Sequence, residues 1–352
     1  MRLYDPMGQI TIRKHTKSSK RLLIAKRKTN TEKQVKQIQV SEHKITRREF
    51  LRNIFFTVIG FTVLEKTANE IQRKPEPIVL EKTRNVPTSF NGEKGSGRPE
   101  LQASLEQYID SMYSSGKIEN DERTAWLAYD LIRKETLVSI NADVPMQCAS
   151  MVKPFVALAF FHKVNKGELV CTEKDKRFLR LMIQHSWNTA TNWFMKQVGG
   201  PDKVNELLQE NYPEIFQHTE IVEYIPSGGM TYKNMSSASD YNRFLRSMWN
   251  RSIPYADEIK NLMGLPNRDR SGDVLTETQI YHKSGSTARM CGDIAILETD
   301  CGDNVCAYTF IGIIDRYDSV PNYMRWKRIR VGIIREASTM VYDTIKQDYR
   351  FG

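Results

Sequence analysis

The 352-residue chain lacks several patterns that mark common functional classes. Its five cysteines form no CxxC pair and have no closely spaced histidines beside them, so the sequence predicts no zinc site. Neither HExxH nor GxSxG occurs, which leaves a zinc peptidase or an α/β-hydrolase without support. The uncharged apolar run Ile54–Leu64 has eleven residues, too few to cross a bilayer. Because the metal-binding patterns are missing, we expect neither a metal nor another cofactor.

Excess positive charge is absent outside the N-terminal segment, although the whole chain carries a formal net charge of +10. Residues 1–53 hold 15 Lys and Arg against 4 Asp and Glu, a net charge of +11, and the rest of the chain is at −1. Because the basic leader holds the whole excess, the sequence predicts no nucleic-acid partner for the folded part. That part is long enough to bury a substantial core.

The leader contains a pattern that is typical of protein export. The stretch Thr46–Asn53 precedes the apolar run Ile54–Leu64, and its paired Arg47 and Arg48 resemble a twin-arginine (Tat) signal. This resemblance predicts the Tat translocase as a partner and a periplasmic or other extracytoplasmic location. No AxA cleavage site follows, Ala68 being the nearest small residue. Retention as a membrane anchor and a basic tail with a chance apolar run stay open as alternatives.

Residues 69–100 are rich in proline, glycine, serine and charge, which predicts a linker. We accordingly divide the chain into a basic leader at 1–68, this linker, and a folded domain at 101–352. The folded domain then has to supply the core and any catalytic site.

Two kinds of hydrophobic periodicity organise the folded domain. Helical spacing predicts a helix at each end, over 101–115 and 328–347, and further helices in the middle. Aromatic and β-branched runs predict five strands, at 124–132, 136–142, 279–285, 291–298 and 305–315. This order predicts an α+β fold, in which a five-stranded antiparallel sheet is flanked by the N- and C-terminal helices. An all-helical lobe is expected as an insertion at about 155–270.

A lysine stands out in the apolar stretch CASMVKPFVALAFF, residues 148–161. A buried ammonium without a partner is costly, so Lys153 is a functional candidate. If a helix begins near Ser150, the serine and the lysine lie three residues apart on one face, and Pro154 is tolerated in the first turn. Such a pair is typical of a nucleophile with an adjacent base.

Two more short patterns follow this SxxK pair along the chain. SxxK itself also occurs at Ser41 and Ser114, but only the copy at Ser150 opens an apolar helix. An SxN pattern at 186–188 is expected between two helices, and a single KSG stands at 283–285 on a predicted strand. The glycine of KSG would let another backbone or a ligand approach closely.

Taken together, SxxK, SxN and KSG in this order resemble the penicillin-recognising serine enzymes, which include class A β-lactamases and D-alanyl-D-alanine peptidases. The resemblance covers about 101–352 and implies a serine hydrolase acting on a β-lactam or a peptidoglycan peptide. It implies catalytic roles for Ser150 as the acylated nucleophile, Lys153 as its base, Ser186 as a proton shuttle and Lys283 as an electrostatic group. It implies substrate contacts from Asn188, Ser284, Gly285 and Ser286, with an oxyanion hole formed by the N–H groups of Ser150 and Ser286.

Two departures from class A enzymes bear on turnover. Ser150 and Ser186 are only 36 positions apart, so part of the helical lobe that walls the cleft is expected to be missing. The ExxxN pattern that supports deacylation is also missing, and Glu223, ahead of Glu220, is the candidate for a residual catalytic base. The alternative interpretation of Glu223 is a solvated carboxylate on a loop. A catalytically weak or inactive wall-binding protein with this fold is therefore the alternative to a working hydrolase.

Other polar residues have weaker interpretations. Arg289 is a candidate for gripping a substrate carboxylate, with a surface arginine as the alternative. His185 and His282 lack metal-ligand spacing and are expected to be surface or packing residues. The cysteines allow a small disulfide between Cys301 and Cys306 or two free thiols, and a pairing of Cys148 with Cys291 is also open.

Overall fold

The computed structural model describes residues 98–226, 228–267, 277–302 and 305–351. The predictions for the leader, the export signal and most of the linker lie outside the described residues. Within these ranges, no helix combines the length and the apolar character that a membrane span requires.

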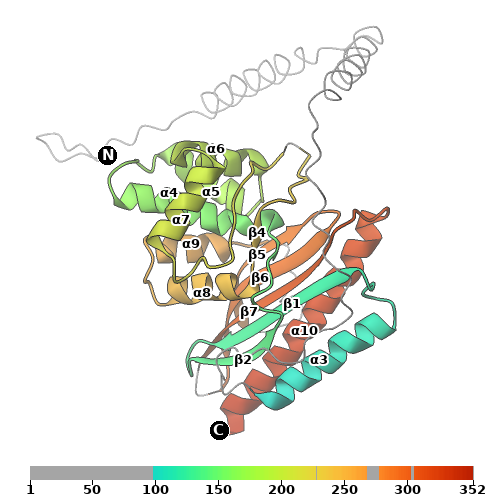
Figure 1. Cartoon of the computed structure of the whole chain (residues 1–352). Coiled ribbons are helices and arrows are strands. Elements are labelled where there is room, and N and C mark those ends of the chain that lie inside the picture. Colours follow the sequence, from blue (N-terminus) through green and yellow to red (C-terminus); the bar gives the residue numbers. More distant parts are fainter. Residues whose placement is uncertain (1–97, 227, 268–276, 303–304, 352) are drawn as a thin grey trace, which may run out of the picture. The chain divides into compact units, whose positions relative to one another are not determined.

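A five-stranded antiparallel sheet forms the centre of the domain, in the order β2-β1-β7-β6-β5 (Figure 1). The sequence-based prediction of its fold class and strand number is confirmed. The strands are β1 Glu122–Asp130, β2 Glu135–Ile140, β5 Thr278–Ser286, β6 Met290–Asp300 and β7 Val305–Arg316. β6 and β7 are almost entirely buried because helices cover both faces of the sheet, which explains their continuous apolar runs.

The N- and C-terminal helices, α3 Pro99–Ser114 and α10 Tyr323–Phe351, cover one face of the sheet (Figure 1). Their apolar faces share a buried cluster with Trp126, Phe310 and other strand side chains. A Cβ atom on Gly312 would lie 2.7 Å from the Trp126 ring, so only glycine leaves room for that ring.

The helical lobe packs on the opposite face of the sheet. It comprises α4 Lys153–Asn165, α5 Glu173–Ile183, α6 Asn188–Val198, α7 Pro201–Asn211, α8 Ala238–Trp249 and α9 Ala256–Met263. The first nine residues of α4 are buried, and Phe155 contacts the rings of Phe216, Tyr241 and Phe244. The predicted lobe is thus present, and α4 forms its central helix. The sequence patterns did not predict a short ribbon of β3 Met146–Gln147 and β4 Met235–Ser236.

The structure decides between the alternative pairings of the cysteines. Cys301 and Cys306 form a disulfide, which confirms the first of the two interpretations. Cys148 and Cys291 are not joined by a disulfide, so their proposed pairing is wrong. Cys148 belongs to the core on the lobe side of the sheet and Cys291 to the core beneath α3 and α10, and the sheet therefore separates their sulfur atoms.

Candidate active site

Ser150 lies in a short 3₁₀ turn, η1 Ala149–Val152, directly before α4. Its neighbours are buried while Ser150 itself is partly exposed. A Cβ atom on Gly285 would lie 3.1 Å from the Ser150 nitrogen and 3.0 Å from the Cys148 oxygen. The glycine of KSG therefore lets β5 lie against the turn that holds Ser150, as the sequence predicted.

Ser186 and Asn188 lie where α5 gives way to α6, as predicted. Ser186 has φ +59°, a left-handed conformation that is uncommon for residues other than glycine. The Trp187 N–H donates to the Leu181 carbonyl oxygen at 3.0 Å and ties this junction to α5. Strained backbone of this kind concentrates at functional sites, where surrounding contacts keep it in place.

Lys153 is fully buried and points toward this junction. Its Nζ donates to Ser186 Oγ at 3.0 Å and to Asn188 Oδ1 at 3.0 Å, and it also donates to the Ser186 carbonyl oxygen. Burial, followed by repulsion from Lys283, lowers the pKa of Lys153 well below the usual range of a lysine. A lysine with a lowered pKa can be neutral near pH 7 and accept a proton.

Lys283 completes the polar centre from β5. It is also buried, and its Nζ donates to Ser186 Oγ at 3.1 Å and to the Ser284 carbonyl oxygen at 2.9 Å. Two lysine nitrogens thus contact the single Ser186 hydroxyl. Because a second ammonium beside the first is unfavourable, this arrangement favours the neutral form of Lys153.

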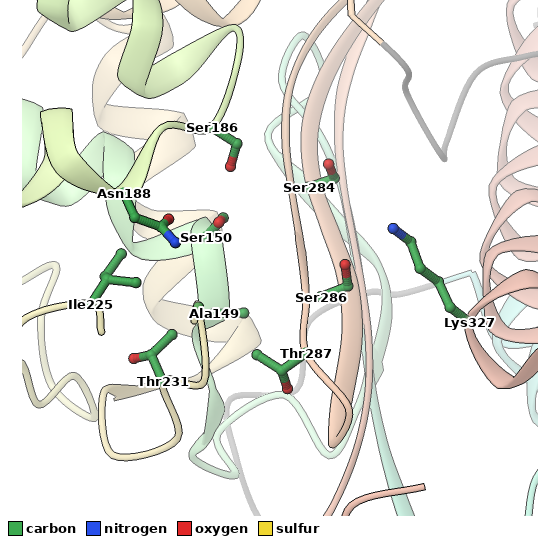
Figure 2. Close-up of a pocket in the computed structure, with 11 residues that line it drawn as sticks. Ala149, Ser150, Ser186, Asn188, Ile225, Thr231, Ser284, Ser286, Thr287 and Lys327 are labelled. Atoms are coloured by element: carbon green, nitrogen blue, oxygen red, sulfur yellow. The ribbon is translucent and has the colours of Figure 1, made fainter. Parts of the chain in front are cut away.

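Ser150, Ser186 and Asn188 line a cavity of about 280 Å³ between the lobe and β5 (Figure 2). It is lined by Ala149, Ser150, Ser186, Asn188, Ile225, Gly229, Thr231, Ser284, Ser286, Thr287 and Lys327. Among the residues that the structure describes, this lining contains hydroxyls, an amide and an ammonium but no carboxylate. Such a set can supply a nucleophile and hydrogen-bond donors to an acyl substrate.

Ser150 and Ser286 contribute to the cavity from opposite sides. The Tyr323 hydroxyl of α10 donates to Ser286 Oγ at 2.8 Å and fixes the end of β5. The first turn of α4 adds partial positive charge on the Ser150 side. The sequence patterns did not single out Tyr323, Ile225, Thr231, Thr287 or Lys327, because tertiary folding alone brings these residues to the site.

Two predicted site residues do not reach the cavity. Glu223 Oε1 accepts hydrogen bonds from Thr231 Oγ1 at 2.8 Å and from the backbone N–H groups of Tyr232 at 2.8 Å and Lys233 at 3.0 Å. Its carboxylate therefore braces a loop and is not among the groups lining the cavity. Arg289 stacks over the Tyr232 ring at 4.1 Å and is likewise not part of the lining. The geometry therefore favours the interpretation of Arg289 as a surface arginine over that of a residue that binds a substrate carboxylate.

The remaining candidates have structural positions. Glu220 is exposed and pairs through its backbone with Met235. His282 is buried with Nδ1 3.0 Å from Asp293 Oδ1, and His185 is exposed. The expectation of a packing residue and a surface residue is confirmed for the two histidines.

Comparison with solved structures places this architecture among known folds. A mutant of PBP-A in an acyl-enzyme complex with penicillin G is 20% identical with a TM-score of 0.57, covering 70% of this chain and 97% of that one. A class A β-lactamase from Bacteroides cellulosilyticus is 18% identical with a TM-score of 0.57, covering 70% and 99% of the two chains. A β-lactamase from Chitinophaga pinensis is 15% identical with a TM-score of 0.56, covering 68% and 99%. At these identities the likeness establishes the fold.

Comparison of the amino-acid sequence with protein families identifies the family, which the structural likeness alone does not. None of the curated protein sequences matches the chain. A family model, described as the β-lactamase enzyme family, matches residues 104–177 and 175–345. These matches include the SxxK, SxN and KSG patterns and nearly all of the folded domain. The chain therefore belongs to the β-lactamase enzyme family of penicillin-recognising serine hydrolases.

Proposed function

We propose that this protein is a serine acyl-transfer enzyme that attacks a β-lactam or a D-alanyl-D-alanine-type wall peptide through Ser150. The observation that carries the proposal is that Ser150, Ser186 and Asn188 line one cavity while two buried lysines contact them from behind the lining. Lys153, whose pKa is lowered, donates to Ser186 and Asn188, and Lys283 donates to Ser186. A serine hydroxyl is a weak nucleophile until an adjacent base removes its proton. Neutral Lys153 supplies that base.

The chemistry proceeds in two steps. Ser150 Oγ loses its proton to Lys153 and attacks the amide carbonyl, and the N–H groups of Ser150 and Ser286 stabilise the resulting oxyanion. Each such donor contributes roughly 10²–10³-fold in rate. Ser186 gives its proton to the departing nitrogen as the C–N bond breaks and regains a proton from protonated Lys153, which leaves an ester on Ser150. Water then attacks the ester and releases the acid.

Covalent labelling tests this function directly. Wild-type protein is incubated with a fluorescent penicillin, and intact mass is expected to rise by one penicillin per chain, with peptide mapping locating the adduct on Ser150. Labelling would exclude a protein that only binds cell wall. A protein that binds penicillin reversibly without a mass increase would instead support the catalytically inactive alternative.

Deacylation is expected to be slow. Acylation needs groups that line or adjoin the cavity, whereas hydrolysis of a bulky acyl-enzyme needs a water held by a general base, a contribution of roughly 10²–10⁴-fold. In the described part of the chain, no carboxylate lines the cavity and Glu223 is engaged by its own loop. Stopped-flow nitrocefin hydrolysis should therefore show a burst of one equivalent followed by a weak steady state.

Glu223→Gln provides the matched control for this prediction. It should leave the burst intact because the carboxylate braces the loop and does not face the substrate. Sustained wild-type turnover above roughly 10² s⁻¹, toward the upper part of the usual enzyme range, would contradict slow release. If Glu223→Gln then accumulated acyl-enzyme, Glu223 would be the base after all.

Export by the Tat route is a separate proposal that rests on the leader sequence. Replacing Arg47 and Arg48 together by lysine is expected to trap the protein in the cytoplasm, because lysine lacks the planar guanidinium of arginine. Cell fractionation measures the outcome, with Arg21→Lys plus Arg27→Lys as a control outside the pattern. Normal periplasmic yield of the first double variant would argue against the route, and membrane retention of the wild type would favour an uncleaved anchor.

A further inference from the structure

Ser286 is the last residue of β5, the outermost strand of the described sheet, and it lines the cavity. It is paired with Cys291, and just beyond it the Thr287 N–H donates to the Met290 carbonyl oxygen at 2.9 Å. Hydrogen-bonded and non-hydrogen-bonded pairs alternate along an antiparallel ladder, so the pair of Ser286 and Cys291 is of the second kind. The backbone N–H of Ser286 therefore points away from β6 and toward the outer edge of β5.

The end of β5 is held by different parts of the molecule on its two faces. Side chains alternate along a strand, so Gly285 and Ser286 face opposite sides of the sheet. On the lobe side, Gly285 lies against the turn of Ser150, where a Cβ atom on the glycine would be 3.1 Å from the Ser150 nitrogen. On the other side, the Tyr323 hydroxyl donates to Ser286 Oγ at 2.8 Å. Ser286 is therefore located by contacts from both faces.

Tyr323 is itself well placed to act as a support. It is the first residue of α10, and its partly buried ring packs against the core beneath that helix. At the far end of α10, the Tyr349 hydroxyl donates to the Asp130 carboxylate of β1 at 2.9 Å. Two tyrosine hydroxyls thus tie the two ends of one helix to different strands. Of these two bonds, only that of Tyr323 reaches a residue that lines the cavity.

The hairpin after β5 has backbone anchors of its own. The Val320 N–H donates to the Ala288 carbonyl oxygen at 3.0 Å, and the Arg316 N–H donates to the Arg289 carbonyl oxygen at 2.8 Å. These bonds keep the hairpin in place whatever residue stands at 323. The bond from Tyr323 instead sets the exact position of Ser286, and an oxyanion donor has to lie about 2.7–3.1 Å from the developing charge.

We propose that Tyr323 is a positioning residue for acyl transfer, which holds the Ser286 hydroxyl and thereby keeps the Ser286 N–H aimed at the carbonyl oxygen of the acyl donor. The inference rests on the proposed acylation of Ser150 and adds a residue of α10 that acts on the oxyanion hole through Ser286. Loss of the Tyr323 hydroxyl misdirects this donor without removing it. The effect should therefore be smaller than the roughly 10²–10³-fold of a lost donor.

A matched pair of variants separates this role from general loosening of α10. Tyr323→Phe and Tyr349→Phe each remove one hydroxyl that ties the helix to the sheet, and only the first should affect the chemistry. Acylation by penicillin G is followed by rapid mixing and intact mass over a range of concentrations. Tyr323→Phe is expected to lower the limiting acylation rate roughly threefold to thirtyfold, with a change of less than about twofold in the affinity of the noncovalent complex. Tyr349→Phe should leave both quantities within about twofold of wild type.

The carbonyl stretching band of the acyl-enzyme reports the oxyanion hole directly, because hydrogen bonds to a carbonyl oxygen lower its stretching frequency. Infrared difference spectra are recorded just after mixing with penicillin G that carries ¹³C at the β-lactam carbonyl. The ester band of Tyr323→Phe should move to higher frequency or gain a second component there. The band of Tyr349→Phe should match that of wild type, since a purely structural loss does not alter the hydrogen bonds to the ester.

A double-mutant cycle tests whether Tyr323 acts through the Ser286 hydroxyl. In a Ser286→Ala background, Tyr323→Phe should cause no further loss of acylation rate, because the bond is already gone. Additive losses, a wild-type rate and band in Tyr323→Phe, or equal effects of Tyr349→Phe would each overturn the inference alone. If Tyr323→Phe fails to fold, Ser286→Ala by itself has to show the slower rate and the shifted band, and a wild-type band there would overturn the inference. Failure of wild type to form any adduct would overturn the proposed function and this inference with it.

Discussion

Ser150→Ala is expected to abolish the covalent penicillin adduct and to lower turnover by roughly 10⁴–10⁶-fold, as removal of a nucleophile does in other serine hydrolases. The side chain is small and partly exposed, so the substitution removes the hydroxyl with little change in packing. Intact mass measures the adduct, and hydrolysis of nitrocefin measures turnover. A melting temperature equal to that of the wild type would show that the variant is folded and that the loss of turnover is chemical.

Ser186 is the rival nucleophile, because its Oγ contacts both Lys153 and Lys283. If Ser186 were acylated, Ser150→Ala would keep the adduct and peptide mapping would locate it there. Ser114→Ala is a matched control, since Ser114 belongs to a second SxxK pair at the exposed end of α3. It should leave labelling and turnover unchanged. Unchanged turnover in Ser150→Ala would remove that residue from the mechanism.

The element order of the fold could be predicted from the sequence because hydrophobic periodicity reflects burial. β6 and β7 are buried on both faces and appear in the sequence as continuous apolar runs. The first part of α4 is buried all round, so the apolar stretch that contains Lys153 marked both a central helix and an unusual charge. The ribbon of β3 and β4 was not predicted, since two-residue strands carry too little pattern.

The candidate site was predictable where motif residues lie next to an element boundary. Ser150 and Ser186 follow this rule, since a turn and a helix junction fix them, and Lys283 lies in the second half of β5, three residues before its end. Glu223 could not be judged in this way, because its carboxylate is directed by loop N–H groups several positions later. Lys327 was missed because only the return of α10 along the sheet places it beside β5.

Lys153→Ala is expected to slow acylation of Ser150 by roughly 10⁴–10⁶-fold, an amount comparable to the loss of the nucleophile. Where several residues act as one catalytic unit, removing any one of them loses nearly the whole rate enhancement. The variant also loses hydrogen bonds to Ser186 and Asn188, so Lys153→Met is made in parallel to preserve the buried stem. Acylation is measured by intact mass and folding by thermal melts. Lys163→Ala, on the same helix but paired with Glu168, is the control. A Lys153→Met protein that fails to fold would identify the lysine as structural.

The pH dependence distinguishes a chemical role for Lys153 from a positional one. Lys153 is neutral above its lowered pKa and can then accept the Ser150 proton, so acylation should persist at neutral pH and be lost as pH falls through that pKa. Lys283→Gln removes the second cause of the lowered pKa, after burial, and should move the acid limb of the rate profile to higher pH. The limb should stay in place in Lys163→Ala. An acid limb that is identical in wild type and Lys283→Gln would show that Lys153 is not the titrating base.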